Sequence, residues 1–377
     1  MGKISNKLNQ IYTAWSNGDK KDFLYYFFFL SLYLFSLLYG IGVRFRFFLY
    51  HIGIFKTEKL NCKVISIGNI TVGGSGKTPM AIFLAQKFLE NGKRPVILSR
   101  GYKGKIKDIG VVSDGKSILL TPNQAGDEPY LMAAKLKNIP VIIGKDRYKT
   151  GLYAIEKFKP NVIILDDGFQ HIRLYRDVDI VLIDLRKGFG NGHLFPLGML
   201  REPLSGLKRG TFFLMKGIKP LFEKNASQIF ISLIKGLAKA RPNGAIEHCF
   251  GYFTYESKNI CDLFNNDRLD VSILKNKRVI ALSGIADPKS FKDTLEELGA
   301  SVIKEIALPD HHSYTHKDIQ IIAGEAENVD MVITTAKDAV KLKSFSIEHL
   351  PIYALDIEVE IKDLDIFEKT VGSANSV

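Results

Sequence analysis

The hydrophobic and polar positions along the chain alternate in a way that predicts an α/β fold. Short apolar runs, typical of buried strands, occur at 63–68, 94–101, 140–144, 161–168 and 178–185. Stretches with helical spacing of apolar residues separate several of them, at 78–92, 128–138 and 147–158. This alternation predicts a mostly parallel sheet with helices on both faces, and such sheets bind ligands at the carboxyl ends of their strands.

The same alternation resumes at residue 278 and predicts a second, smaller α/β domain. Strand patterns recur at 278–284, 300–308, 329–336 and 351–361, and helical patterns at 290–299 and 316–327. Between the two regions the pattern is weaker, with short strand-like pieces and a polar stretch. We therefore predict a first domain at 51–225, a β linker or connector at 226–277, and the smaller domain at 278–377.

One segment near the amino terminus breaks the pattern of a soluble protein. Residues 23–43 form a run of 21 residues without a charge, and basic residues flank both ends. A run of that length can cross a bilayer as one helix, and no small-residue cleavage site follows it. We interpret residues 1–50 as carrying a retained membrane-associated helix, with a buried helix or an oligomer contact as the alternative. Whether the helix spans the membrane or lies in its interface stays open, because tyrosines and serines lower the hydrophobicity of this segment.

Composition narrows the kind of partner. The chain has 377 residues and a formal net charge of +12, which favours acidic partners such as nucleotide phosphates, phospholipid head groups or nucleic acid. Its three cysteines form no C-x-x-C pair, which argues against a disulfide framework or a cysteine zinc site.

The stretch GNITVGGSGKTP at 68–79 resembles a phosphate-binding loop, although Thr71 stands where the usual motif has its first glycine. The stretch follows a predicted strand and opens a predicted helix, so its backbone N–H groups can converge on phosphate oxygens. Lys77 would reach the terminal phosphates and Thr78 would help to hold magnesium. A helix start with an incidental G-K-T is the alternative. The other nucleotide-binding positions expected in this loop are Gly73, Gly74, Ser75 and Gly76.

A phosphate loop predicts an acidic residue at the end of a neighbouring strand to organise magnesium. Asp166 and Asp167 end the strand predicted at 161–168, with a turn or helix cap as the alternative. Gln170 lies just beyond, within reach of the nucleotide. Arg147 and Arg201, in predicted strand-end loops, are candidates for contacts to phosphate.

Two further loops carry groups suited to phosphate transfer. Asp127 directly precedes a proline-led helix, so it is either the helix cap or a base that accepts a proton from an alcohol, and the two roles are compatible. The sequence PDHHSYTH places Asp310 before His311 and two further histidines. A histidine oriented by the neighbouring aspartate is one interpretation, and a zinc site is the other.

The sequence also indicates which nucleotide base is bound. Guanine-specific P-loop proteins carry an N-K-x-D motif, and its absence here favours an adenine nucleotide over a guanine nucleotide.

At this point the chain resembles a known family, the tetraacyldisaccharide 4′-kinases. The resemblance is carried by GNITVGGSGKTP, SRGYKG, GDEPYLMA, KDR, DDGFQHIRLYRD, GNGHLFPLGMLREPL, SGIADPKSF, PDHHSYTHKD and TAKDAVKL, in that order over about residues 64–342. Ser75, the lysine in SRGYKG and the segment FPLGMLREP depart from the family pattern. The last of these leaves the details of lipid or sugar contact in doubt.

The resemblance implies a P-loop NTPase-like, three-layer α/β/α domain joined by a small β linker to a second α/β domain. It implies transfer of the γ-phosphate of ATP, with Mg²⁺, to the 4′-hydroxyl of an acylated glucosamine disaccharide 1-phosphate. The product would be lipid IVA of lipid A (lipopolysaccharide) biosynthesis. The enzyme would work on the cytoplasmic face of the bacterial inner membrane, with membrane lipid and no nucleic acid as partners, and no oligomer is predicted.

By the same resemblance Asp127 is the catalytic base, assisted by His311 with Asp310. Glu128, Asp166 and Asp167 would serve magnesium together with Thr78, and Lys77 would act on the phosphates. The rival hypothesis is a membrane-anchored P-loop ATPase that acts as a nucleotide-gated adaptor or transport component, in which Asp127 would only cap a helix.

Overall fold

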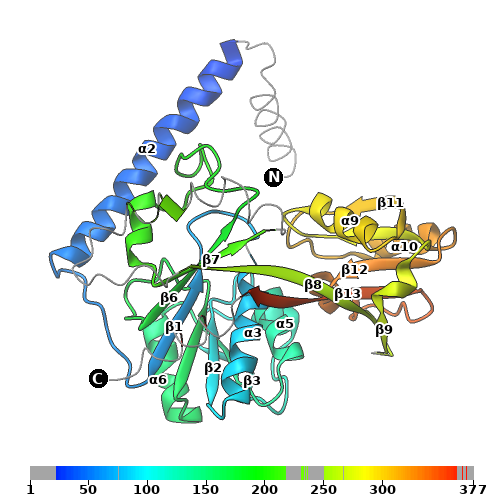
Figure 1. The fold of residues 1–377 in the computed structure, drawn as a ribbon, viewed down its shortest axis with the longest axis horizontal. Helices are drawn as coiled ribbons and strands as arrows, with labels where there is room; N and C mark the ends of the chain where they lie inside the picture. Colours follow the sequence, from blue (N-terminus) through cyan, green and yellow to red (C-terminus); the bar gives the residue numbers. More distant parts are fainter. Residues whose placement is uncertain are drawn as a thin grey trace. The chain divides into compact units, whose positions relative to one another are not determined.

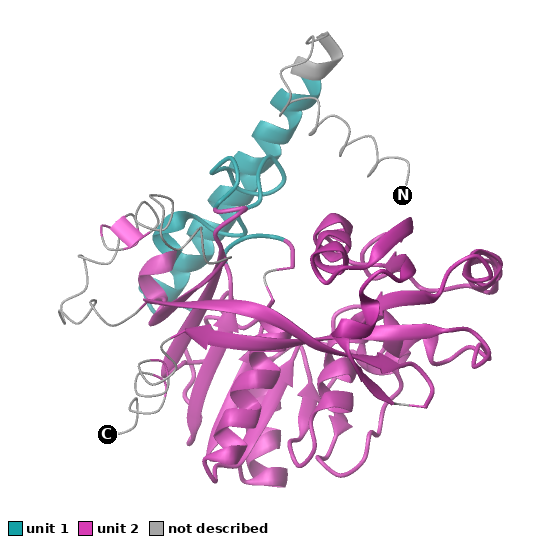
Figure 2. Ribbon diagram, turned by 45° about the vertical axis from the view of Figure 1, so that its right-hand side comes forward, with its two compact units in different colours: residues 1–55, 70–72, 189–206 teal, residues 56–69, 73–188, 207–377 magenta. Residues whose placement is uncertain are grey.

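The computed structural model describes residues 23–74, 76–217, 250–265 and 267–362, together with single positions at 231, 232, 234, 236, 367 and 371. The chain divides into two compact units (Figure 2). The first contains residues 1–55, 70–72 and 189–206, and the second contains residues 56–69, 73–188 and 207–377.

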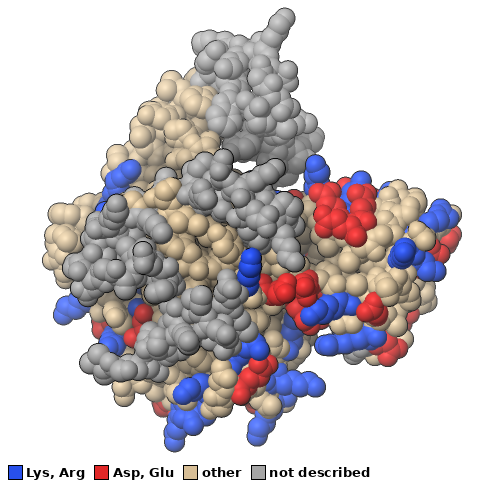
Figure 3. Space-filling model, in the orientation of Figure 1, with Lys and Arg blue, Asp and Glu red and all other residues tan. Residues whose placement is uncertain are grey.

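The first unit is built on a long apolar helix, α2 (Phe23–His51). Its stretch from Phe27 to His51 is long and apolar enough to cross a membrane by length and composition, and little of it is buried. The face drawn in Figure 3 carries few charged side chains over this helix, whereas Lys, Arg, Asp and Glu are spread over the second unit. Within the unit, the Ser36 hydroxyl donates to the Leu194 carbonyl (2.8 Å) and the Tyr39 hydroxyl donates to the Arg201 carbonyl (2.7 Å).

The second unit contains one continuous sheet (Figure 1). Among the described residues it has thirteen strands, in the order β11-β10-β12-β13-β8-β7-β6-β1-β5-β2-β4-β3, with β9 paired to β8. The strands are β1 (Lys63–Gly68), β2 (Pro95–Ser99), β3 (Gly110–Ser113), β4 (Val141–Ile143), β5 (Val162–Asp166), β6 (Val178–Asp184), β7 (Phe212–Lys216), β8 (Phe250–Asp262), β9 (Arg268–Asp270), β10 (Arg278–Ser283), β11 (Ser301–Ala307), β12 (Met331–Thr335) and β13 (Ile352–Lys362).

Helices cover both faces of each half of this sheet. They are α3 (Lys77–Glu90), α4 (Pro122–Ala125), α5 (Asp127–Lys135), α6 (Arg147–Phe158), α9 (Pro288–Glu297), α10 (His316–Ala326) and α11 (Ala336–Leu342), with short 3₁₀ turns at Leu204–Arg209 and Val271–Leu274. Side chains of α3 and α5 share one core with the strands, and α6 packs on the opposite face. Likewise, α9 packs on one face of the second half, and α10 and α11 pack on the other.

The predicted α/β fold, with helices on both faces of a mostly parallel sheet, is confirmed. Every residue of β1, β2, β5 and β6 is buried, which explains why these strands are continuous apolar runs. The sequence analysis did not predict β3, β7 or α11. The predicted domain boundaries stay a prediction, and the sheet itself does not break between them, because β8 pairs with β7 on one side and with β13 on the other.

Candidate active site

The glycine-rich loop follows the carboxyl end of β1 and leads into α3, as the sequence predicted. Gly76, directly before the helix, has φ of 83°, a left-handed backbone conformation that favours glycine. A Cβ built at Gly76 would also lie 1.3 Å from the Tyr255 hydroxyl oxygen, so there is no room for a side chain. Gly73 and Gly74 have open space where a side chain would stand. Ser75 lies outside the described residues.

Lys77 is the first residue of α3 and is largely buried beside the loop. Its Nζ lies 3.2 Å from the Asn69 Oδ1 and 3.7 Å from the Asp167 Oδ1. The Gln170 amide donates to the Asn69 carbonyl (2.8 Å). Thr78 is buried in the first turn of α3. The structure therefore brings Lys77, Asp167 and Gln170 together beside Asn69, the first residue after β1.

Two other predicted residues, Thr71 and Arg201, belong to the first unit. Thr71 forms a β-bridge with Leu200. The Arg201 backbone N–H donates to the Ile70 carbonyl (2.7 Å), and the Tyr39 hydroxyl donates to the Arg201 carbonyl. In the described structure both residues thus help to join the short strip at 70–72 to the segment at 189–206.

Asp166 ends β5 in a buried position, 2% exposed. The Ser99 hydroxyl donates to its Oδ2 (3.1 Å), while its buried Oδ1 has no hydrogen-bond partner. Burial, followed by the nearby charges of Glu128 and Asp167, raises the pKa of the Asp166 carboxyl to about 7, against the opposing effect of Lys77. A cation beside this carboxyl would stabilise its ionised form.

These residues suit Mg²⁺ in the manner of a nucleotide site. The described residues contain no group of three or more His, Cys, Asp or Glu side chains that could hold a metal ion alone. Mg²⁺, however, is usually bound by one or two carboxylates together with substrate phosphates and water. The Asp166 Oδ1, which has no hydrogen-bond partner, is free to bind such an ion. The raised pKa of the same carboxyl means that its ionised form is unfavourable here unless a positive charge lies close to it.

Arg147 is the predicted phosphate contact on this side of the sheet, and it is 3% exposed at the start of α6. Its Nη1 donates to the Gly144 carbonyl (2.5 Å), and its Nε has no hydrogen-bond partner. Burial lowers the pKa of the Arg147 guanidinium to about 10, although Asp166 and Asp167 act in the opposite direction. Arg147 therefore stays a cation near the carboxylates of the strand end.

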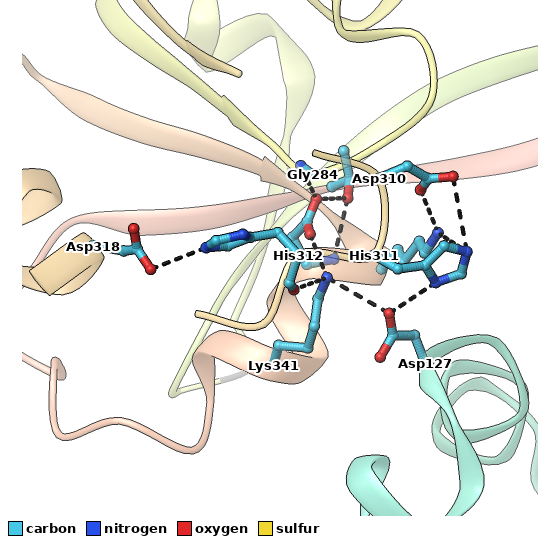
Figure 4. Close-up of polar contacts among 10 residues, drawn as sticks. Asp127, Gly284, Asp310, His311, His312, Asp318 and Lys341 are labelled. Atoms are coloured by element: carbon cyan, nitrogen blue, oxygen red, sulfur yellow. Dashed lines mark hydrogen bonds and ion pairs between the residues drawn. The ribbon is translucent and has the colours of Figure 1, made fainter. Parts of the chain in front are cut away.

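The second predicted cluster assembles around Asp127 (Figure 4). Asp127 begins α5, and Gly126, with φ of 91°, occupies the cap position instead. The Asp127 Oδ2 lies 3.2 Å from the His311 Nδ1 and 3.6 Å from the Lys341 Nζ. Burial opposes ionisation of Asp127, but the hydrogen bond with His311 and the charge of Lys341 together lower the pKa of its carboxyl. Asp127 is thus an ionised carboxylate that faces a histidine from the other half of the sheet.

His311 is held in an unusual conformation. Its φ of 60° is rare for a residue other than glycine and is often found at functional sites. The Tyr102 ring packs edge-on against the imidazole, with 5.5 Å between ring centroids. Asp310 lies 3.8 Å from the His311 Nε2, too far for a hydrogen bond, and Lys337 bonds to both residues.

The neighbouring histidines do not support the zinc alternative. His312 bonds to Asp318 (3.0 Å), and the ring of His316 packs against Phe345. Among the described residues no three ligands converge there. The sequence analysis named no role for three residues of α11, Lys337, Asp338 and Lys341. The signal was in the sequence, since the motif TAKDAVKL contains all three residues and its two lysines lie four residues apart, on one helix face.

Comparisons with known proteins agree on one family. Residues 28–374 match the family model described as tetraacyldisaccharide-1-P 4′-kinase. The chain is 42% identical to the tetraacyldisaccharide 4′-kinase of Desulfatibacillum aliphaticivorans, covering 91% of each protein. It is 40% identical to the protein of that name from Syntrophus aciditrophicus, covering 91% of this chain and 92% of the relative.

A solved structure gives the same result. The chain resembles LpxK from Aquifex aeolicus, whose crystal structure was determined in complex with ATP. The TM-score is 0.72 at 34% sequence identity, and the match covers 92% of this chain and 99% of the other.

Proposed function

The chain belongs to the tetraacyldisaccharide-1-P 4′-kinase family, and from that premise we propose how its residues move a phosphate from ATP to the 4′-hydroxyl of a glycolipid. The protein is a kinase that uses ATP and Mg²⁺ in lipid A biosynthesis, and its acceptor is a glycolipid precursor of lipid A. The observation that carries our proposal is the pairing of the Asp127 carboxylate with His311 across the two halves of the sheet.

At the nucleotide end, the backbone of the glycine-rich loop and the first turn of α3 would hold the phosphates. Lys77 would leave Asn69 for the terminal phosphates, which attract its charge more strongly than a neutral amide. Asp166, Asp167, Glu128 and Thr78 would hold Mg²⁺, which when bound spreads the charge of the phosphate oxygens. Arg147 would balance the remaining negative charge from its buried position.

At the acceptor end, Asp127 would accept the proton of the 4′-hydroxyl as that oxygen bonds to the γ-phosphorus; the bond from that phosphorus to the bridging oxygen breaks, and ADP leaves with the electron pair. The low pKa of its carboxyl keeps it ionised and therefore able to take the proton. His311 would orient the carboxylate. Phosphate transfer needs positioning and charge more than covalent chemistry, and these two residues supply the positioning for the acceptor.

We further propose that the disaccharide carries a 1-phosphate and that α2 attaches the enzyme to the cytoplasmic face of the inner membrane, where the acyl chains of the acceptor reside. The apolar, mostly exposed stretch from Phe27 to His51 supports this attachment. Arg201 would contact phosphate.

The test is transfer of labelled phosphate from ATP to a detergent-dispersed disaccharide 1-phosphate lipid. Wild-type protein should label the lipid, and Asp127→Asn should lower the rate by about 10²- to 10⁴-fold, the usual contribution of a general base. Asp108→Asn, a change at an exposed aspartate, is the matched control and should keep the wild-type rate. ATP hydrolysis without labelled lipid, at a rate that Asp127→Asn leaves unchanged, would favour the membrane-anchored ATPase instead.

A further inference from the structure

The side of His311 that faces away from Asp127 is occupied by a lysine. The Lys337 Nζ lies 3.2 Å from the His311 Nε2 and 2.9 Å from the Asp310 Oδ1. His311 thus has the Asp127 carboxylate at Nδ1 (Figure 4) and the Lys337 ammonium group at Nε2. The site of Lys337 is largely buried, and its side chain is 16% exposed.

This arrangement decides which ring nitrogen carries the proton. An ammonium group has three donors and no acceptor, so the hydrogen bond from Lys337 requires a bare Nε2. The single proton of the neutral imidazole is then on Nδ1, where it can be donated to the Asp127 Oδ2. A doubly protonated ring would point an N–H at the Lys337 cation, which is unfavourable.

We propose that Lys337 is a positioning residue that fixes His311 as the Nδ1–H tautomer and so makes it a hydrogen-bond donor to Asp127. The contacts of Asp127 with His311 and Lys341 both use Oδ2. Oδ1 is therefore the oxygen offered to the acceptor hydroxyl, a consequence that rests on the proposed function. In this arrangement His311 orients the base and does not itself take the proton.

The backbone that carries Lys337 is fixed by its own contacts, which supports this assignment. Thr335 caps α11, since its Oγ1 accepts from the Asp338 N–H (3.1 Å) and donates to the Asp338 Oδ2 (2.8 Å). The Gly284 N–H also donates to the Asp338 Oδ2 (2.8 Å). Asp310 then holds the ammonium group itself. Lys337 consequently approaches His311 from a rigid helix start and not from a free side chain on a loop.

The test is the tautomer of His311, measured by nitrogen NMR on full-length protein with ¹⁵N-labelled histidine, without nucleotide or lipid. The chain has eight histidines, and the signals lost in His311→Gln identify the ring. We expect a protonated Nδ1 and a bare Nε2 in the wild type. Lys337→Met should shift His311 towards the Nε2–H tautomer, Lys337→Arg should retain the wild-type state, and Lys317→Met, at an exposed lysine, should change nothing.

A protonated Nε2 in the wild type, or a tautomer that Lys337→Met leaves unchanged, would overturn the proposal. The kinetic counterpart is a loss of kcat of about 10- to 100-fold in Lys337→Met with little change in the KM for ATP, and partial recovery in Lys337→Arg. An unchanged kcat in Lys337→Met would also contradict it. Because the NMR measurement needs no substrate, it decides the tautomer even if no lipid is phosphorylated.

Discussion

The phosphate end and the acceptor end of the site balance their charges in opposite ways. Around the glycine-rich loop, Asp166 is buried with an unpartnered oxygen, and this burial, followed by the charges of neighbouring carboxylates, raises the pKa of its side chain. Around Asp127, each carboxylate faces a donor of this chain, with Lys337 on Asp310 and Lys341 between Asp127 and Asp338. With respect to the pairing of carboxylates with donors of this chain, the first end is therefore incomplete and the second is complete, and the second leaves only the Asp127 Oδ1 for the acceptor.

After loss of the base itself, the largest effect should come from Lys77, the lysine of the incomplete end. Lys77→Ala removes the cation nearest to the loop, and we expect transfer of labelled phosphate to fall by about 10²- to 10³-fold, the usual loss for one preorganised donor. The stabilisation of the protein by nucleotide should fall as well. A variant that binds nucleotide and transfers phosphate normally would contradict the assignment of this end.

A change at the complete end should separate chemistry from nucleotide binding. His311→Gln removes the hydrogen bond to Asp127, and we expect the transfer rate to fall by about 10- to 100-fold, less than complete loss of a general base. The shift in melting temperature caused by MgATP should stay at the wild-type value, since His311 is not at the loop. If that shift disappeared, the two ends would not be separate.

Removal of metal should affect only the phosphate end. A non-hydrolysable ATP analogue at about 100 times its Kd should add about 2.7 kcal/mol to the free energy of unfolding when Mg²⁺ is present, and much less with EDTA. Asp166→Asn should lose the Mg²⁺-dependent part, because it removes a proposed ligand. Its stability without ligand should be equal to the wild type or higher, because the buried charge is gone. Equal analogue-induced shifts with and without EDTA would refute this.

The smallest effect should come from Tyr255, which lies against Gly76 with a buried hydroxyl that has no hydrogen-bond partner. Burial, and then the charge of Asp184, raises the pKa of this phenol above its usual range. Tyr255→Phe should leave the free energy of unfolding unchanged or raise it by up to about 1 kcal/mol, as measured by chemical denaturation. A loss of more than about 1 kcal/mol would show that the hydroxyl has a partner when the protein is folded.

The two ends also differ in how far the sequence predicts them. The phosphate end is local, since Gly76, Lys77 and Thr78 are consecutive, and Asp166 ends one strand with Asp167 directly after it. A motif and a strand pattern are therefore enough to propose it. The fold was predicted for the same reason, because apolar runs and helical spacing are local properties of the chain.

The acceptor end depends on the tertiary arrangement. Asp127 and His311 are 184 residues apart. Asp310 was predicted to orient His311 directly, whereas in the structure Lys337 bonds to both Asp310 and His311. The sequence around Lys337 does not indicate that its side chain contacts the imidazole of His311, which lies after a different strand. The strand β3, which the sequence analysis missed, lies at the sheet edge and has only four residues, from Gly110 to Ser113.

The ribbon of β8 and β13 has a consequence for the synthesis of the protein. β8 is translated about a hundred residues before β13, yet each pairs with the other along most of its length. Val359, Ile361, Phe367 and Val371 also enter the core that surrounds α3. The half that carries the glycine-rich loop therefore cannot finish packing until residues 352–371 have left the ribosome, and until then the side of β8 that pairs with β13 is an open sheet edge prone to aggregation.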